Sequence, residues 1–160
     1  MDGGTGHGLS LPDHGVKTKQ GPHGELLFDP VRRKWLRSTP EERVRQHVIN
    51  HLLIDLKCPP GLIGVEVSLT LNGLAKRADL VVHDRDGRAL VIVECKAPSV
   101  RVDQRTFEQA ARYNSVLRVP FLMVTNGSTH YCCMVDHARG AVEFLPRLPD
   151  HAALSAYVRP

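Results

Sequence analysis

The sequence lacks any apolar stretch long enough to cross a membrane. Its 160 residues are 42% hydrophobic and 24% charged, which is ordinary for a soluble globular protein. A transmembrane helix needs roughly 20 predominantly apolar residues in succession, and no run approaches that length. Residues 1–8 have neither a basic start nor an apolar stretch, so they do not read as a signal peptide. We therefore expect one cytoplasmic domain without a membrane partner.

The sequence has only four cysteines, and their spacing indicates neither a metal site nor a disulfide bond. The four cysteines show neither a disulfide nor a zinc pattern, which favours reduced thiols; they are Cys58, Cys95, Cys132 and Cys133. The sequence also lacks a Gly-x-x-x-x-Gly-Lys motif, which excludes a P-loop nucleotide site. The net charge of +4 is compatible with nucleic-acid binding but does not require it.

Turn-forming residues divide the chain into a coarse series of elements. Residues 24–36 read as a hairpin turning at Asp29-Pro30. A helix then begins with Thr39 as N-cap, Pro40 at the first position and Glu42 completing a capping box. The periodicity predicts strands over 65–71, 78–83 and 89–96, a helix over 102–117, and strands over 120–125 and 130–135. Residues 1–22 and 149–160 are expected to be a flexible N-terminal tail and a loosely packed C-terminal tail.

The strand over residues 89–96 ends in an unusual way. Its apolar run is followed by Glu94, Cys95 and Lys96. Side chains alternate between the two faces of a strand, so Glu94 and Lys96 point to the same side. Charges on a buried strand are costly unless they are paired or bind an ion. This pair therefore predicts a third charged group nearby.

The preceding strand supplies such a group. Asp86-Gly87 lies between two apolar runs, a strong signal for a two-residue type I′ turn. That turn sets His83 opposite Leu90, Val81 opposite Ile92, and Asp79 opposite Glu94. Opposed side chains lie about 4.5–5.5 Å apart at Cβ, where two like charges are destabilising. A divalent cation would reverse that effect, because Mg²⁺ is commonly held by one or two carboxylates.

These residues resemble a known family. An Asp on one strand with Glu-x-Lys on the next is similar to the PD-(D/E)XK nuclease superfamily, although Ala78 stands where the superfamily name has Pro. More closely, the chain resembles the N-terminal domain of type I restriction enzyme R subunits, over roughly residues 25–145. The matching segments, in order, are 28–35, 39–46, 77–79, 93–98, 109–114 and 125–127.

The resemblance implies an α/β fold with a restriction-endonuclease-like αβββαβ core. Its central mixed sheet has helices on both faces, which agrees with the apolar character of both faces of the central strands. The nuclease domain is expected to span residues 23–148, with the hairpin as an N-terminal addition. The implied activity is a Mg²⁺-dependent endonuclease acting on DNA, with Mn²⁺ able to substitute. Partner proteins of a restriction system and a homodimer are compatible with that role.

Asp79 and Glu94 are the expected metal ligands, together with the backbone carbonyl of Cys95. Their structural alternative is a pair of acids neutralised by Arg77 and Lys96. As a catalytic residue, Lys96 has two open roles: it orients and helps deprotonate the attacking water, or it stabilises charge on the scissile phosphate.

The resemblance also implies an acid from the first helix that approaches the site. Glu42 already has a role in the capping box. Glu41 lies nearer the middle of the apolar helix face at about 100° per residue. We favour Glu41 as a ligand and keep both as catalytic candidates.

Basic and polar residues around the acids are candidates for nucleic-acid binding. Arg45 falls on the inward face of the first helix and either binds phosphate or pairs with Glu41. Gln109 and Tyr113 share one face of the second helix. The resemblance implies that they lie near the site and position Lys96 or a phosphate, and a buried Tyr with a hydrogen-bonded neighbour is a nearly equal alternative. The basic candidates in the clusters before and beside the acids are Arg33, Lys34, Lys76 and Arg77, which attract a phosphate backbone.

Two alternatives to cleavage stay open. The chain could be a non-cleaving module that grips DNA, RNA or a partner protein on a nuclease fold. Its small size, without a motor or a sequence-reading part, suits that role. The acidic cluster could also be purely structural.

Overall fold

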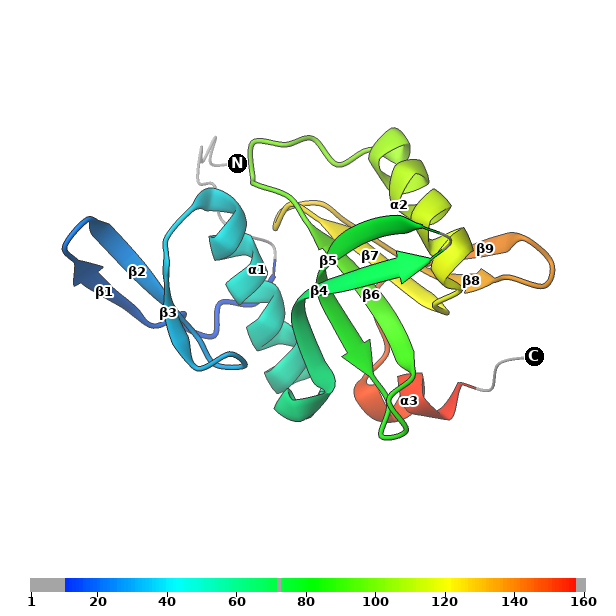
Figure 1. The fold of residues 1–160 in the computed structure, drawn as a ribbon, viewed down its shortest axis with the longest axis horizontal. Coiled ribbons are helices and arrows are strands. Elements are labelled where there is room, and N and C mark those ends of the chain that lie inside the picture. The colour runs from blue at the N-terminus through cyan, green and yellow to red at the C-terminus, as the bar shows by residue number, and fades with distance from the viewer. Residues whose placement is uncertain (1–10, 72, 158–160) are drawn as a thin grey trace, which may run out of the picture.

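The computed structural model describes residues 11–71 and 73–157, apart from the side chains of residues 71, 74, 113, 115 and 116. Its centre is a six-stranded mixed sheet with the strand order β4-β5-β6-β7-β8-β9 (Figure 1). Only the β6–β7 pair is parallel, and α2 (Gln104–Leu117) connects those two strands. The strands are β4 (Ile63–Leu71), β5 (Leu74–His83), β6 (Ala89–Cys95), β7 (Phe121–Thr125), β8 (His130–Asp136) and β9 (Ala141–Leu145). The expected mixed α/β sheet is confirmed, with β9 as an unpredicted edge strand.

Apolar side chains on the two faces of this sheet form two separate cores. Val91 and Val93 of β6 pack in the core that contains the α1 residues, whereas Ile92 packs with Phe107 of α2. Cys132 and Cys133 fall into different cores, as expected for neighbours on a strand. The prediction of helices on both faces is therefore confirmed.

The first helix, α1 (Pro40–Asn50), begins where the sequence predicts. Thr39 is the N-cap, and its Oγ1 accepts a hydrogen bond from Glu42 N at 3.1 Å. The helix continues as a π-helical turn, His51–Asp55. Within the described residues no helix has the length and apolarity needed to span a bilayer.

The hairpin β5–β6 keeps the expected strand register but not the expected turn. Val81 pairs with Ile92, as predicted. The loop is longer than two residues, because the Asp84 carboxylate accepts hydrogen bonds from Asp86 N and Arg88 N. A bulge then pairs His83 with Ala89 and not with Leu90. The prediction of a two-residue turn was wrong. The bulge at His83 compensates for the longer loop, so the pairing of Val81 with Ile92 is unchanged.

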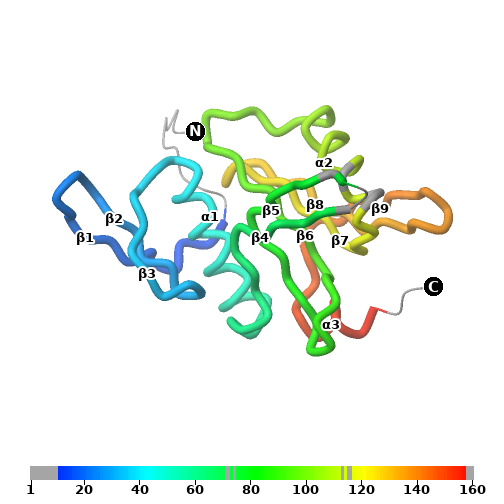
Figure 2. The backbone as a smooth tube through the Cα atoms, in the orientation of Figure 1, coloured from blue at the N-terminus to red at the C-terminus, as the bar shows by residue number. Residues whose placement is uncertain are grey.

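The N-terminal addition is larger than the expected hairpin. β2 (Gly24–Asp29) and β3 (Lys34–Arg37) form that hairpin, and β1 (Thr18–Gly21) adds a third strand. Leu11 is also buried in the core beneath α1, so the expected tail over 1–22 is corrected for its described part; residues 1–10 lie outside the described residues. The small sheet lies on the far side of α1 from the large one (Figure 2).

The C-terminal segment is not loosely packed as expected. α3 (His151–Ala156) is capped by Asp150, whose carboxylate accepts from Ala153 N. Leu154 is fully buried, and His151 N donates to Leu56 O at 2.7 Å. A six-residue helix shows too little periodicity to be recognised from sequence.

Candidate functional site

The expected acids lie where β5 and β6 separate. Backbone pairing between these strands ends at Leu80↔Val93. Beyond it, Asp79 Oδ2 accepts a hydrogen bond from Cys95 N at 2.8 Å. A side chain thus takes the place of the next backbone partner, and the strands part at Asp79 and Glu94. A splayed strand end gives side chains from both strands access to one region.

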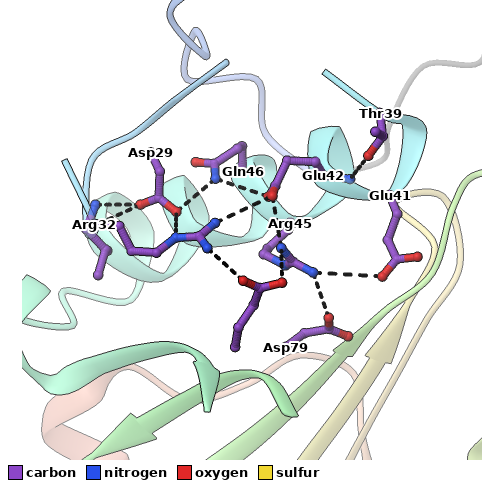
Figure 3. Close-up of polar contacts among 10 residues, drawn as sticks. Asp29, Arg32, Thr39, Glu41, Glu42, Arg45, Gln46 and Asp79 are labelled. Atoms are coloured by element: carbon purple, nitrogen blue, oxygen red, sulfur yellow. Dashed lines mark hydrogen bonds and ion pairs between the residues drawn. The ribbon is translucent and has the colours of Figure 1, made fainter. Parts of the chain in front are cut away.

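Arg45 of α1 lies directly over the Asp79 carboxylate (Figure 3). Its Nη2 is 2.9 Å from Asp79 Oδ1 and its Nη1 is 2.9 Å from Glu42 Oε1. Glu66 and Glu41 lie farther away, at 3.5 and 3.8 Å. Burial alone would lower the pKa of Arg45, but the Glu42 and Asp79 charges outweigh it and raise that pKa. The guanidinium is therefore a fixed positive charge in contact with four carboxylates.

A second arginine extends this network towards the small sheet. Arg32 contacts Asp29 at 2.7 Å, Glu66 at 3.0 Å and Glu42 at 3.4 Å. Gln46 Nε2 donates to Asp29 at 3.1 Å and to Glu42 at 3.3 Å (Figure 3). Glu42 thus joins both arginines, and the network ties β2, α1, β4 and β5 together.

Asp29, the last residue of β2, is fully buried. Burial alone would raise its pKa, but hydrogen bonds from the Arg32 backbone and side chain and from Gln46 hold that pKa below its usual value. Val31 N adds another hydrogen bond at 2.8 Å. The carboxylate is therefore charged and well satisfied, which marks a structural anchor.

Glu94 has a different counter-ion from Asp79. Lys76 Nζ lies 3.0 Å from Glu94 Oε1, and Glu94 is buried. Burial raises the pKa of Glu94, Lys76 opposes the rise, and the Asp79 charge adds to it. The carboxylates of Asp79 and Glu94 therefore interact electrostatically, although each forms an ion pair with a different cation, Arg45 and Lys76 respectively.

Lys96 lies in a pocket beside Glu94. The pocket has a volume of about 220 Å³ and is lined by Lys76, Glu94, Lys96, Thr106, Gln109, Ala110 and Val124. Lys96 N donates to Thr125 O at 2.8 Å, which fixes its backbone against β7. Across the described part of the chain, no carboxylate lies within ion-pairing distance of Lys96 Nζ. The direct ion-pair partners of the two acids are thus Arg45 and Lys76, and not the expected Arg77 and Lys96, although the charge of Lys96 also opposes the rise that burial causes in the pKa of Glu94.

The donor set suits Mg²⁺ in chemistry, since carboxylate and carbonyl oxygens are its preferred protein ligands. Asp79, Glu94 and the Cys95 carbonyl supply such oxygens at one strand end. Over residues 11–71 and 73–157, however, no three acidic, His or Cys side chains gather closely enough to hold a metal ion. A cation would therefore replace Arg45 and Lys76 as the partner of these two acids.

Residues 40–149 match the family model described as the type I restriction enzyme R protein N terminus. The chain belongs to this family. A solved fragment from Vibrio vulnificus YJ016, described as an HsdR subunit of a type I restriction enzyme, is 30% identical. That match covers 57% of this chain and 17% of the other, with a TM-score of 0.38. The chain thus matches only a small part of that protein's length. A search of curated proteins found no match.

The first-helix acids of this family member differ in their surroundings. Glu42 is largely buried between the arginines. The Glu41 side chain is 51% exposed and approaches the same Arg45 nitrogen that binds Asp79. Glu41 therefore faces Asp79 from the solvent side, and both glutamates stay candidates.

The expected nucleic-acid residues fall into separate groups. Lys76 and Gln109 line the Lys96 pocket, and Arg77 is exposed next to Lys76 on β5. Arg33 and Lys34 are exposed on the small sheet. Arg45 lies with the acids, and the side chain of Tyr113 is outside the described residues.

Three residues of the site were not found from the sequence: Arg32, Gln46 and Glu66. Glu66 could have been found by counting back from the turn at Gly73. Leu71 pairs with Leu74, and the pairs Val65↔Leu80 and Val67↔Ala78 leave Glu66 opposite Asp79. Glu66 itself has φ 52°, a conformation that costs about 1–3 kcal/mol for a non-glycine residue and often occurs at functional sites.

Proposed function

We propose that this chain is a Mg²⁺-dependent endonuclease domain that hydrolyses phosphodiester bonds in DNA, of the restriction or DNA-processing type. The observation that carries the proposal is the end of the β5–β6 pairing, where Asp79 accepts the Cys95 N–H and the neighbouring Glu94 and Lys96 line one pocket. Lys96 makes no ion pair with a described residue, and its charge opposes the rise that burial causes in the pKa of Glu94. Such an ammonium group suits a contact with a bound phosphate.

Each residue has a role in that chemistry. Asp79, Glu94 and the Cys95 carbonyl would hold Mg²⁺, which when bound activates water and screens phosphate charge. Lys96 orients and helps deprotonate the attacking water, or stabilises negative charge on the scissile phosphate. Glu41, on the solvent side of Asp79, is the better placed of the two helix acids to join them.

The cations that neutralise the acids have a second use in this proposal. If Asp79 and Glu94 held a metal ion, Arg45 would keep its Glu42 contact, while Arg45 Nη2 and Lys76 would turn from these two acids towards phosphate oxygens. Arg77 is exposed beside Lys76, and Gln109 lines the same pocket. These groups would position the DNA backbone, because phosphate contacts fix the register of a protein on DNA.

The partners follow from the family. Type I restriction enzyme R proteins belong to a restriction system, so DNA and other proteins of such a system are the proposed partners. Cutting both strands of a duplex would require two such sites, which a homodimer would supply.

A second candidate function is a non-cleaving module that binds nucleic acid or a partner protein on the same fold. The direct Arg45–Asp79 ion pair favours it, as does the lack of a three-ligand cluster among the described residues. A site closed by its own arginine has no need of a metal ion.

Nicking of supercoiled plasmid decides between these functions. We expect cleavage in Mg²⁺ or Mn²⁺ that EDTA abolishes and that Lys96→Ala lowers about 10²–10⁴-fold. The matched control is Arg101→Ala, which removes an exposed cation two residues before α2's N-cap and should leave the rate unchanged. Cleavage that survives Asp79→Asn combined with Lys96→Ala contradicts the nuclease proposal. Metal-independent binding without nicking supports the second function.

A further inference from the structure

The small N-terminal sheet has one face that the site does not use. The strand register shows which side chains lie on this face. Lys19 pairs with Leu26, Leu26 with Arg37, and Phe28 with Trp35. Phe28 N donates to Lys17 O, which sets Lys17 beside Phe28. Paired residues point to the same side of a sheet. We call this side the outer face, formed by Lys17, Lys19, Leu26, Phe28, Trp35 and Arg37.

The opposite side of the sheet faces the protein. Leu27 and Asp29 alternate with the outer-face residues along β2, and both are fully buried. Asp29 binds Arg32 and Gln46, and Glu25 forms an ion pair with Arg43 of α1. The acids of the sheet thus point inwards, where arginines neutralise them.

Every charged residue of the outer face is basic. Lys17, Lys19 and Arg37 are exposed, and no acid stands at any outer-face position of these three strands in the described chain. Uniform positive charge on one sheet face is not needed for folding. It is the pattern expected for a surface that meets a polyanion.

Two aromatic rings lie among these cations. Phe28 and Trp35 have ring centroids 5.2 Å apart, and Trp35 is 37% exposed. Lys19 Nζ lies 4.3 Å from the Trp35 ring and Lys17 Nζ 5.7 Å from the Phe28 ring. Lysine ammonium groups therefore contact these rings, and no further layer of the described chain covers the exposed Trp35 ring.

Cations and open aromatic rings on a sheet face suit a single-stranded nucleic acid. Its phosphates meet the basic side chains, and its unstacked bases can stack on aromatic rings. The bases of a duplex are already stacked on each other, so a duplex would use only the charges. We propose that the outer face binds single-stranded nucleic acid, with Trp35 as the stacking platform and Lys17, Lys19 and Arg37 as phosphate contacts.

This surface is independent of the candidate active site. Residues 17–37 precede the segment that matches the family model, which begins at residue 40. The large sheet and the small sheet that carries the outer face lie on opposite sides of α1 (Figure 1). The proposal therefore stands whether or not the Asp79 site cuts DNA.

Trp35 is the only tryptophan in the chain, so its fluorescence reports on the outer face alone. Titration of the full chain with an oligothymidylate should quench this fluorescence. A duplex of the same length should quench it much less. Asp79→Asn should leave the titration unchanged, which keeps failure of the nuclease proposal separate from failure of this one.

Variants then test the contacts by anisotropy of a labelled oligothymidylate. Lys19→Ala with Arg37→Ala should weaken binding at least 10-fold and lower the slope of log affinity against log salt by about 1.4, at about 0.7 per phosphate contact on a single strand. Arg139→Ala is the control, because it removes a cation that is 84% exposed in the loop between β8 and β9, and it should change affinity less than twofold. Circular dichroism checks that each variant is folded.

Trp35→Leu separates stacking from charge, because it keeps an apolar side chain and every cation. It should weaken oligothymidylate binding about 10-fold and leave duplex binding unchanged. Three results would each overturn the proposal: no quenching of Trp35, equal losses in Arg139→Ala and in the Lys19/Arg37 variant, or equally tight binding of polyglutamate. The last result would indicate a surface for acidic proteins.

Discussion

Arg45 Nη2 lies 2.9 Å from Asp79 Oδ1, while Asp79 Oδ2 accepts the Cys95 N–H at 2.8 Å. Both oxygens of the expected catalytic aspartate are thus engaged by the protein itself. The aspartate holds α1 to the splayed end of the central hairpin. Asp79 therefore stabilises the fold and is also the proposed metal ligand, so experiments on Asp79 must measure stability and activity separately.

Asp79→Ala should lower the free energy of unfolding by about 2–3 kcal/mol, because it removes one of the acceptors of the buried Arg45 guanidinium and leaves the Cys95 N–H without its acceptor. Asp79→Asn keeps a carbonyl oxygen for Cys95 N and should cost about 1 kcal/mol less. Urea unfolding at pH 7 measures both. Asp86→Ala, in the exposed hairpin loop, is the control. Equal stability of all three variants would contradict the structural role of Asp79.

Because of Asp29, the free energy of unfolding should fall at acidic pH. Its pKa is held below its ordinary value in the folded state, so the unfolded chain binds the proton more readily. The stabilisation is present above the unfolded pKa of about 3.9 and is lost as pH falls through the lower folded pKa. Asp29→Asn should lower the stability at pH 7 and flatten its fall in acid.

Unfolding free energies between pH 2.5 and 7 measure this effect as a difference between the two proteins. Wild type and Asp29→Asn should converge as the pH falls. If the two plots of unfolding free energy against pH stay parallel over the whole range, protonation of Asp29 is not coupled to unfolding.

The four thiols should resist modification while the protein is folded. All four are free and buried, and burial raises the pKa of Cys58 to about 12, of Cys132 to about 11 and of Cys133 to about 12. Burial also raises the pKa of Cys95 well above its usual value. Because the thiolate is the reactive form, a disulfide reagent at pH 8 should react slowly with the native chain and rapidly with four thiols in urea. Fast reaction without denaturant would contradict this burial.

α3 should contribute measurably to stability. Leu154→Ala removes a fully buried side chain and should cost about 3 kcal/mol. Val142→Ala on β9 shortens a side chain that is 41% exposed, and should cost well under 1 kcal/mol. Thermal unfolding compares the two. Similar losses would mean that the C-terminal segment is as loose as its sequence suggests.

The sequence predicted the parts of the fold that have strong local signals. Thr39 and Pro40 mark the start of α1 because capping is a local property. The Val81–Ile92 register was deduced from the expected Asp86-Gly87 turn, and it is confirmed because the bulge at His83 offsets the longer loop. The hairpin turn failed because the Asp84 side chain replaces backbone hydrogen bonds in the loop, and β1 and α3 were too short to show a period.

The candidate site was predicted less completely, for a different reason. Glu94 and Lys96 were selected because strand alternation puts them on one face, and Asp79 was selected because the expected turn set it opposite Glu94. The partners of these acids come from other elements, and pairs such as Arg45–Asp79 and Lys76–Glu94 are tertiary contacts. A single sequence carries no signal for such a pair. Glu66 is the exception, since its position opposite Asp79 follows from the turn at Gly73.

Mn²⁺ binding measured by calorimetry on the full chain tests the central claim most directly. If Asp79 and Glu94 share one ion, wild type should bind Mn²⁺, and Asp79→Asn and Glu94→Gln should each weaken binding about 10-fold or more, against an unchanged Asp86→Asn control. Binding that neither substitution alters, or no binding to the wild type at millimolar Mn²⁺, would contradict it.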